Sequence, residues 1–160
     1  MSERISTSRV IPATPSAVFE VLTDPEGHVA IDSSGMLQSA EGQRPSAVGD
    51  SFNVHMDRES LGDVPMGRYD VEVVITRIDE DALVEWTIHG TIKPPIGHVY
   101  GYELVADPSG TRVTSYCDWS DAAEKWKHVF PVIDEKSLRA SLGILERAVL
   151  RGYPRPGQDA

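Results

Sequence analysis

The sequence contains a single cysteine, Cys117, among its 160 residues. One cysteine excludes an internal disulfide framework and fits a reducing compartment, so we expect a cytoplasmic protein. Basic residues are also scarce, because 15 Lys and Arg stand against 25 Asp and Glu, which gives a formal net charge of -10. Nucleic acids and anionic membranes attract proteins with a positive surface, so this balance argues against both as partners.

Long apolar runs and catalytic motifs are missing as well. No run approaches the roughly 18 apolar residues of a membrane span, and the first residues, MSERISTSRVIPAT, contain no apolar signal segment. There is no G-x-S-x-G, P-loop, Rossmann glycine set or C-x-x-C motif, and the histidines lack a metal-ligand spacing. We therefore expect no membrane insertion, no metal and no cofactor, and we assign no catalytic residue.

What the sequence does contain is one long amphipathic helix near its end, predicted from Pro131 to Arg151. Leu138, Leu142, Leu145 and Val149 recur at i, i+4, i+7 and i+11, which places four apolar side chains on one stripe. Acidic residues open the segment and basic residues close it, in agreement with the helix dipole. Such a stripe needs an apolar surface to cover it.

The rest of the chain reads mainly as strands, because apolar and polar residues alternate with a period of two. Expected strands are residues 3–12, 36–41, 51–57, 69–78, 83–89, 98–106 and 111–119. One short helix begins at Thr14-Pro15 and a second covers residues 28–31. We predict an α+β fold in which a curved seven-stranded antiparallel sheet wraps around the C-terminal helix, with two short helices between strands 1 and 2. Residues 1–152 form one domain and residues 153–160 a tail.

The order of these elements resembles a known family. The segments that carry the resemblance are GRYDVEVVITRIDEDALVEWTIHG (67–90), YELVADPSGTRVTSYCDWS (102–120) and LRASLGILERAV (138–149). Together they look like the polyketide cyclase/dehydrase branch of the START-like superfamily, also called Bet v 1-like or SRPBCC. The resemblance implies the helix-grip fold, whose curled sheet and last helix enclose a cavity for a hydrophobic ligand. Most members bind ligands and a minority catalyse, and no catalytic residue carries over.

Alternation also indicates which strand side chains face the helix. At one end of the sheet they are aliphatic, whereas at the other they are aromatic and polar, which is typical of a ligand pocket. Three long loops, residues 58–67, 90–97 and 121–130, cover the aromatic end and suit a gate. The residues predicted to bind ligand are Phe52, Val54, Met56, Tyr69, Val71, Trp86, Ile88, Tyr100, Tyr102, Ser115, Cys117, Trp119, Leu138, Ser141 and Leu142, with Arg68 as a polar anchor.

Three functions are compatible with this pattern. The primary prediction is binding of a hydrophobic, lipid- or polyketide-like small molecule between the sheet and the C-terminal helix. The second is a polyketide cyclase or dehydratase, with Tyr100, Tyr102 and an arginine as acid, base and oxyanion groups. The third is a co-chaperone-like interaction module on the same fold. A closed core filled by the aromatic side chains is the structural alternative, and the oligomeric state is left open.

The remaining polar residues that could serve catalysis or metal binding are interpreted as structural. His28 and Asp32 are four residues apart and are interpreted as a surface pair, because no nucleophile or oxyanion donor lies near them in the sequence. His55, His89 and His98 are interpreted as solvent-facing. Cys117 is expected to be a buried apolar side chain rather than a nucleophile.

Overall fold

The predicted sheet is confirmed in the computed structural model, which describes residues 2–62 and 65–153. One antiparallel sheet of seven strands has the order β1-β7-β6-β5-β4-β3-β2. The strands are β1 (Arg4–Ile11), β2 (Leu37–Glu41), β3 (Ser51–Asp57), β4 (Arg68–Asp79), β5 (Leu83–His89), β6 (Val99–Asp107) and β7 (Gly110–Asp118). The helices are α1 (Pro15–Leu22), α2 (Pro25–Ala30) and α3 (Glu135–Arg151), with short 3-10 helices η1 (Glu59–Leu61) and η2 (Glu124–Val129).

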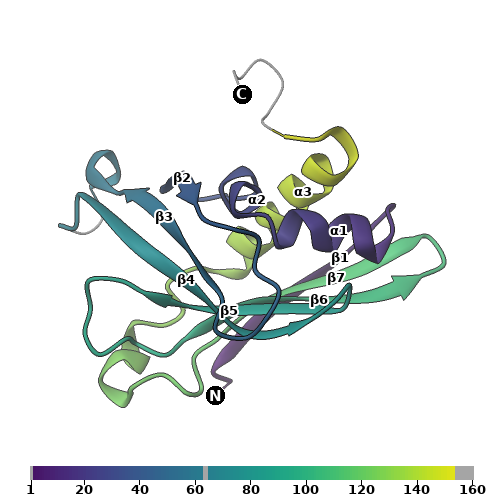
Figure 1. Ribbon diagram of the computed structural model, residues 1–160. Coiled ribbons are helices and arrows are strands. Elements are labelled where there is room, and N and C mark those ends of the chain that lie inside the picture. Colours follow the sequence, from purple (N-terminus) through teal and green to yellow (C-terminus); the bar gives the residue numbers. More distant parts are fainter. Residues whose placement is uncertain (1, 63–64, 154–160) are drawn as a thin grey trace.

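The three α-helices lie on one face of the sheet, and the strands curve around them (Figure 1). The long helix α3 packs along β1 and β7, α1 covers β5 to β7, and α2 packs on β2 at the opposite edge. A twisted antiparallel sheet curls in this way because its concave face must be covered by apolar surface. None of the helices in the described part of the chain is long and apolar enough to cross a membrane.

Side chains at the helix starts decide where the two short helices begin. The Thr14 hydroxyl accepts a hydrogen bond from the Ala17 backbone N–H at 3.2 Å and caps α1, as predicted. The second helix begins at Pro25 rather than at residue 28. Asp24 caps it by accepting a hydrogen bond from the Glu26 N–H at 3.0 Å, and Pro25 occupies the first helical position.

The long helix is shorter at its start than predicted, because α3 begins at Glu135 and not at Pro131. The Asp134 carboxylate accepts a hydrogen bond from the Ser137 N–H at 2.9 Å, which makes Asp134 the cap. Its apolar stripe is confirmed, since Leu138, Leu142 and Leu145 are all buried.

The aliphatic end of the sheet is a closed core. α1 and the second half of α3 meet the sheet there and fill its concave face. The buried side chains of this core include Val18 and Leu22 from α1, Val84, Leu104 and Val113 from the strands, and Leu142 and Leu145 from α3.

The last described residue, Tyr153, also belongs to the fold. Its ring packs against the main core, and its hydroxyl donates a hydrogen bond to the Asp24 carboxylate. Tyr153 is the first residue after the predicted boundary at residue 152, and these contacts connect it to α2 and the core. Residues 154–160 lie outside the described part of the chain.

The outer face of the sheet holds a buried polar cluster that the alternation did not predict. Tyr116 is 1% exposed, and its ring lies over Gly101 on the neighbouring strand. Its hydroxyl donates a 2.8 Å hydrogen bond to Glu85, whose other oxygen accepts from the Thr76 hydroxyl at 2.7 Å. The Arg4 guanidinium lies 3.9 Å from the centroid of the Tyr116 ring. Gly101 leaves the space that lets this tyrosine lie flat on the sheet.

Candidate functional site

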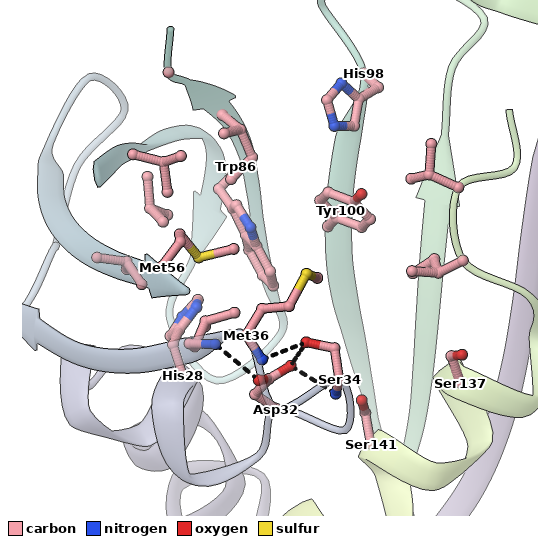
Figure 2. A pocket seen from close by; sticks show the side chains of 18 of the residues that line it. His28, Asp32, Ser34, Met36, Met56, Trp86, His98, Tyr100, Ser137 and Ser141 are labelled. Atoms are coloured by element: carbon pink, nitrogen blue, oxygen red, sulfur yellow. Dashed lines mark hydrogen bonds between the residues drawn. The ribbon is translucent and has the colours of Figure 1, made fainter. Parts of the chain in front are cut away.

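A cavity of about 550 Å³ lies at the aromatic end of the sheet, bordered by α2, α3 and strands β3 to β7. Most of its wall is apolar. Figure 2 shows Met56 and Trp86 on one side of this space and Tyr100 on another, with Ser137 and Ser141 approaching from α3. A cavity of this size and character can enclose one small organic molecule.

Most of the residues predicted to bind ligand line this cavity. Alternation placed them on the inward face of their strands, and the cavity occupies the part of that face that the helices leave uncovered. The predicted residues on the wall are Val54, Met56, Tyr69, Val71, Trp86, Ile88, Tyr100, Tyr102, Ser115, Leu138 and Ser141.

Four predicted residues do not line the cavity. Leu142 is fully buried in the main core, and Phe52 packs among the aliphatic side chains of β3 and β4. Cys117 and Trp119 form a separate cluster, because the segment after β7 folds back over them and Phe130 stacks on Trp119 at 5.6 Å between ring centroids. All four are buried, but each packs in a hydrophobic cluster and none of them is part of the cavity wall.

The predicted polar anchor Arg68 does not reach the cavity either. Its side chain is 79% exposed and lies 3.6 Å from the Asp57 carboxylate and 3.5 Å from that of Glu59. Tyr69 is the inward residue at this point of β4, so its neighbour Arg68 must point outward. Arg58 is an arginine that lines the cavity.

His28 was predicted to lie on the surface, and the structure contradicts this. It is buried, lines the cavity, and its ring meets the Trp86 ring edge-on at 4.7 Å between centroids. Nε2 lies 2.7 Å from the Leu22 carbonyl oxygen, which can only accept, so Nε2 carries the proton. The prediction was wrong because it considered only the lack of a nucleophile or oxyanion donor near His28, which says nothing about burial; His28 packs against Phe52 and Trp86 of the sheet.

Asp32, the predicted partner of His28, instead organises the loop after α2. Its carboxylate accepts from the backbone N–H of Ser34 at 2.9 Å and from the Ser34 hydroxyl at 2.6 Å (Figure 2). The neighbouring Ser33 hydroxyl donates to the Ser137 carbonyl at 3.2 Å and lies 3.1 Å from the Ser141 hydroxyl. These bonds tie the loop to α3 and close one end of the cavity.

Burial keeps two histidines and two tyrosines on the wall neutral. Burial lowers the pKa of His28 and of His98 to about 4, and it raises the pKa of Tyr102 to about 12. Burial raises the pKa of Tyr100 in the same direction. Behind the wall, burial raises the pKa of the Cys117 thiol to about 12, so the thiol stays protonated.

His98 is the second histidine that we misplaced. It was expected to face solvent, but it is buried, lines the cavity and packs edge-on against Tyr100 at 5.2 Å between ring centroids. Its position carried the signal, because His98 shares the even-numbered register of Tyr100 and Tyr102. His55, by contrast, is on the outer face as predicted, with Nδ1 2.6 Å from the Asp70 carboxylate.

Acid is expected to destabilise the fold through His28. Its pKa of about 4 in the folded chain is below the ordinary 6.5, so the unfolded chain takes up this proton first as the pH falls. The stability that neutral His28 contributes is complete above pH 6.5 and is lost as the pH falls towards 4. The loss between pH 7 and pH 5 is roughly 2 kcal/mol. His28→Gln should remove this part of the pH dependence, measured by urea unfolding at both pH values.

His55→Gln is the matched control, with the opposite sign. The Asp70 and Glu41 carboxylates raise the pKa of His55. Its stabilising contribution is therefore present at low pH and is lost as the pH rises. Removing His55 should make the acid loss larger. If His28→Gln kept the full acid loss of the parent, the neutral buried His28 would not be its source.

A curved antiparallel sheet that grips a C-terminal helix beside an internal cavity defines a helix-grip protein. The family model described as "Polyketide cyclase / dehydrase and lipid transport" matches residues 2–149. The chain therefore belongs to this family, and the resemblance to the START-like, Bet v 1-like superfamily is confirmed.

Individual relatives are distant. The uncharacterized protein Rv0088 of Mycobacterium tuberculosis is 28% identical over 121 residues, which cover 74% of this chain and 49% of that protein. The chain thus spans about half the length of this curated relative. The structure of Ms6760 from Mycobacterium smegmatis is 14% identical, with a TM-score of 0.67 and coverage of 95% of this chain and 94% of that one. DynU16, described as a putative protein in the dynemicin biosynthetic locus, is 16% identical, with a TM-score of 0.62 and coverage of 96% and 49%. At identities this low, the similarity shows that these proteins share the fold of this chain.

Proposed function

We propose that this protein binds one hydrophobic small molecule, lipid- or polyketide-like, in the cavity between the sheet and α3. The observation that carries the proposal is the cavity itself, about 550 Å³ of space with a largely apolar wall. Binding of an apolar guest to a wall of this kind is favourable, because the guest removes the apolar surface from water. The family description, which includes lipid transport, agrees with such a role.

The distribution of packing supports a cavity over a filled core. The aliphatic end is closed by α1 and the second half of α3, whereas the aromatic end is bordered by loops and by the first turns of α3. Met66, Ile92 and Val129, one from each of the three loops predicted to form a gate, all lie on the wall. A guest can enter by displacement of loops, without disturbing the core that stabilises the fold.

Filling the cavity from within should abolish binding. Ile88 lines the cavity and is only partly buried, so the larger ring of Ile88→Trp can extend into open space at little cost in stability. We expect its Kd for pyrene, followed by pyrene emission, to rise at least about tenfold, because the ring removes room and apolar contact.

Val105→Trp is the control, since Val105 is 61% exposed on β6 and away from the cavity. Its affinity for pyrene should equal that of the parent. The proposal fails if the parent protein binds neither pyrene, nor a sterol, nor a long-chain fatty acid, and if native mass spectrometry of the fresh protein finds no bound small molecule.

A cyclase or dehydratase activity stays an alternative. Tyr100 and Tyr102 line the cavity as the hypothesis requires, but burial keeps both phenols protonated. They can donate hydrogen bonds, yet neither can serve as the base at neutral pH. No observation on the described residues favours an interaction module. We also propose a cytoplasmic location, because the one cysteine, Cys117, is free and a free cysteine fits a reducing compartment.

A further inference from the structure

Two buried side-chain atoms in the described residues have no hydrogen-bond partner, Nδ1 of His98 and Nε1 of Trp126. Both residues line the same cavity. A buried polar atom without a partner costs free energy, and native proteins leave few of them. Two such atoms on one wall indicate a place where a guest supplies the missing partner.

Both side chains belong to the loop end of the cavity. His98 directly precedes β6, and Figure 2 shows it beyond Tyr100, at the opposite end from Asp32 and Ser34. Trp126 lies in η2, which the backbone ties to the loop before His98 through the 2.9 Å hydrogen bond from Ala123 N–H to the Ile96 carbonyl. The Phe130 ring lies 4.9 Å from the His98 ring and helps to hold this end together.

Several other polar groups on the wall have hydrogen-bond partners. Nε2 of His28 is bonded to the Leu22 carbonyl, and the Ser33 hydroxyl donates to the Ser137 carbonyl. The Asp32 carboxylate accepts from the loop that follows it. An apolar guest would leave the two atoms of His98 and Trp126 without partners. These atoms therefore favour guests that carry a polar group over guests that do not.

The chemistry of the two atoms restricts that group. An indole N–H only donates, so the guest must offer an acceptor to Trp126. His98 is neutral at pH 7 because burial lowers its pKa to about 4, and its Nδ1 accepts or donates according to the tautomer. A hydroxyl satisfies both atoms, and a carbonyl satisfies both when Nδ1 carries the proton. Neither of these two groups carries a positive charge to compensate a desolvated carboxylate, so an anion would be favoured through a contact with Arg58 on the same wall and not through these two groups.

We propose that the ligand carries a neutral oxygen function, a hydroxyl or a carbonyl, at its loop-facing end, where Trp126 Nε1 and His98 Nδ1 hold it. The inference rests on the proposed function, because it names the chemistry of the molecule in the same cavity. It assigns the two side chains as the groups that set ligand specificity and orientation.

Three compounds with the same ring system test the proposal: pyrene, 1-hydroxypyrene and 1-pyrenecarboxylate, titrated at pH 7 and followed by pyrene emission. We expect 1-hydroxypyrene to bind about tenfold more tightly than pyrene, because its hydroxyl pairs buried groups that pyrene leaves unpaired. The carboxylate should bind no more tightly than pyrene.

Trp126→Phe and His98→Phe remove the nitrogen atoms and keep an aromatic ring at each position. The advantage is the ratio of the Kd for pyrene to the Kd for 1-hydroxypyrene, both measured on the same variant. Each substitution should reduce this ratio to about threefold or less, and the double variant should abolish the advantage. Trp119→Phe is the control, because this indole is buried outside the cavity and should leave the advantage intact. Thermal melting verifies that each variant is folded.

Failure of this inference is distinguishable from failure of the proposed function. If pyrene binds but the hydroxyl brings no gain, or if the gain survives in the double variant, the assignment of His98 and Trp126 is wrong and the cavity still binds apolar molecules. Tighter binding of the carboxylate would show that the end group is an anion. If none of the three compounds binds, the proposed function fails and this inference fails with it.

Discussion

Replacing Leu145 by alanine is expected to lower the free energy of unfolding by about 2 to 5 kcal/mol. Leu145 is fully buried on α3 and packs in the main core beside Leu142 and Val113. Its truncation leaves a void that the surrounding strands and helices fill only in part, because a packed core relaxes incompletely. Urea unfolding measures the loss, and the Kd for pyrene should stay within about twofold of the parent.

Leu138→Ala is the matched comparison on the same helix. Leu138 is 4% exposed, but it borders the cavity, so truncation enlarges a space that already exists. Its main effect should be on the Kd for pyrene, with a smaller loss of stability than Leu145→Ala. Leu150→Ala, at a position 49% exposed, should change neither quantity. If instead Leu138→Ala caused the larger loss of stability and Leu145→Ala altered the Kd for pyrene, the binding site would be at the other end of the sheet.

Gly101→Ala is expected to lower the free energy of unfolding by about 2 to 4 kcal/mol, although it adds only one methyl group. A Cβ at this position would overlap Cζ and the hydroxyl of Tyr116. The tyrosine ring must then leave the sheet, which breaks its 2.8 Å hydrogen bond to Glu85 and uncovers that carboxylate. Urea unfolding of the variant measures the cost.

A double-mutant cycle with Tyr116→Ala tests the cause. Tyr116→Ala alone removes a buried ring and should be destabilising. In that background the clash no longer exists, so Gly101→Ala should add less than about 1 kcal/mol. Additive losses would mean that the methyl group acts on the strand itself and not through Tyr116.

The strand pattern was predictable because it depends on local chemistry. In a meander each strand pairs with its neighbour in the sequence, and a period of two assigns side chains to faces without knowledge of the rest of the fold. The turn from Asp107 to Gly110 is an example, since Asp107 accepts from the Ser109 N–H at 2.9 Å as an aspartate in a tight turn does. Strand bounds were therefore accurate to one residue.

Helix starts were less predictable, because proline gives two opposite signals. Pro25 can end one helix or open the next, and Pro131 can open a helix or precede one. The carboxylates of Asp24 and Asp134 decide between these outcomes by reaching a backbone N–H two or three residues ahead. The predicted second helix therefore began at residue 28, three residues after the observed start of α2 at Pro25.

The amino-acid sequence by itself determined the order of the elements, the antiparallel sheet and the inward face of each strand, since these follow from nearest-neighbour pairing and alternation. Only the tertiary structure decided which inward side chains close into a core and which border a cavity. Leu142 and Leu138 share one stripe, yet α1 and the strands close around Leu142 while Leu138 faces open space. Loops contribute Arg58 and Trp126 to the wall, and their positions depend on contacts between segments far apart in the sequence, which no local pattern contains.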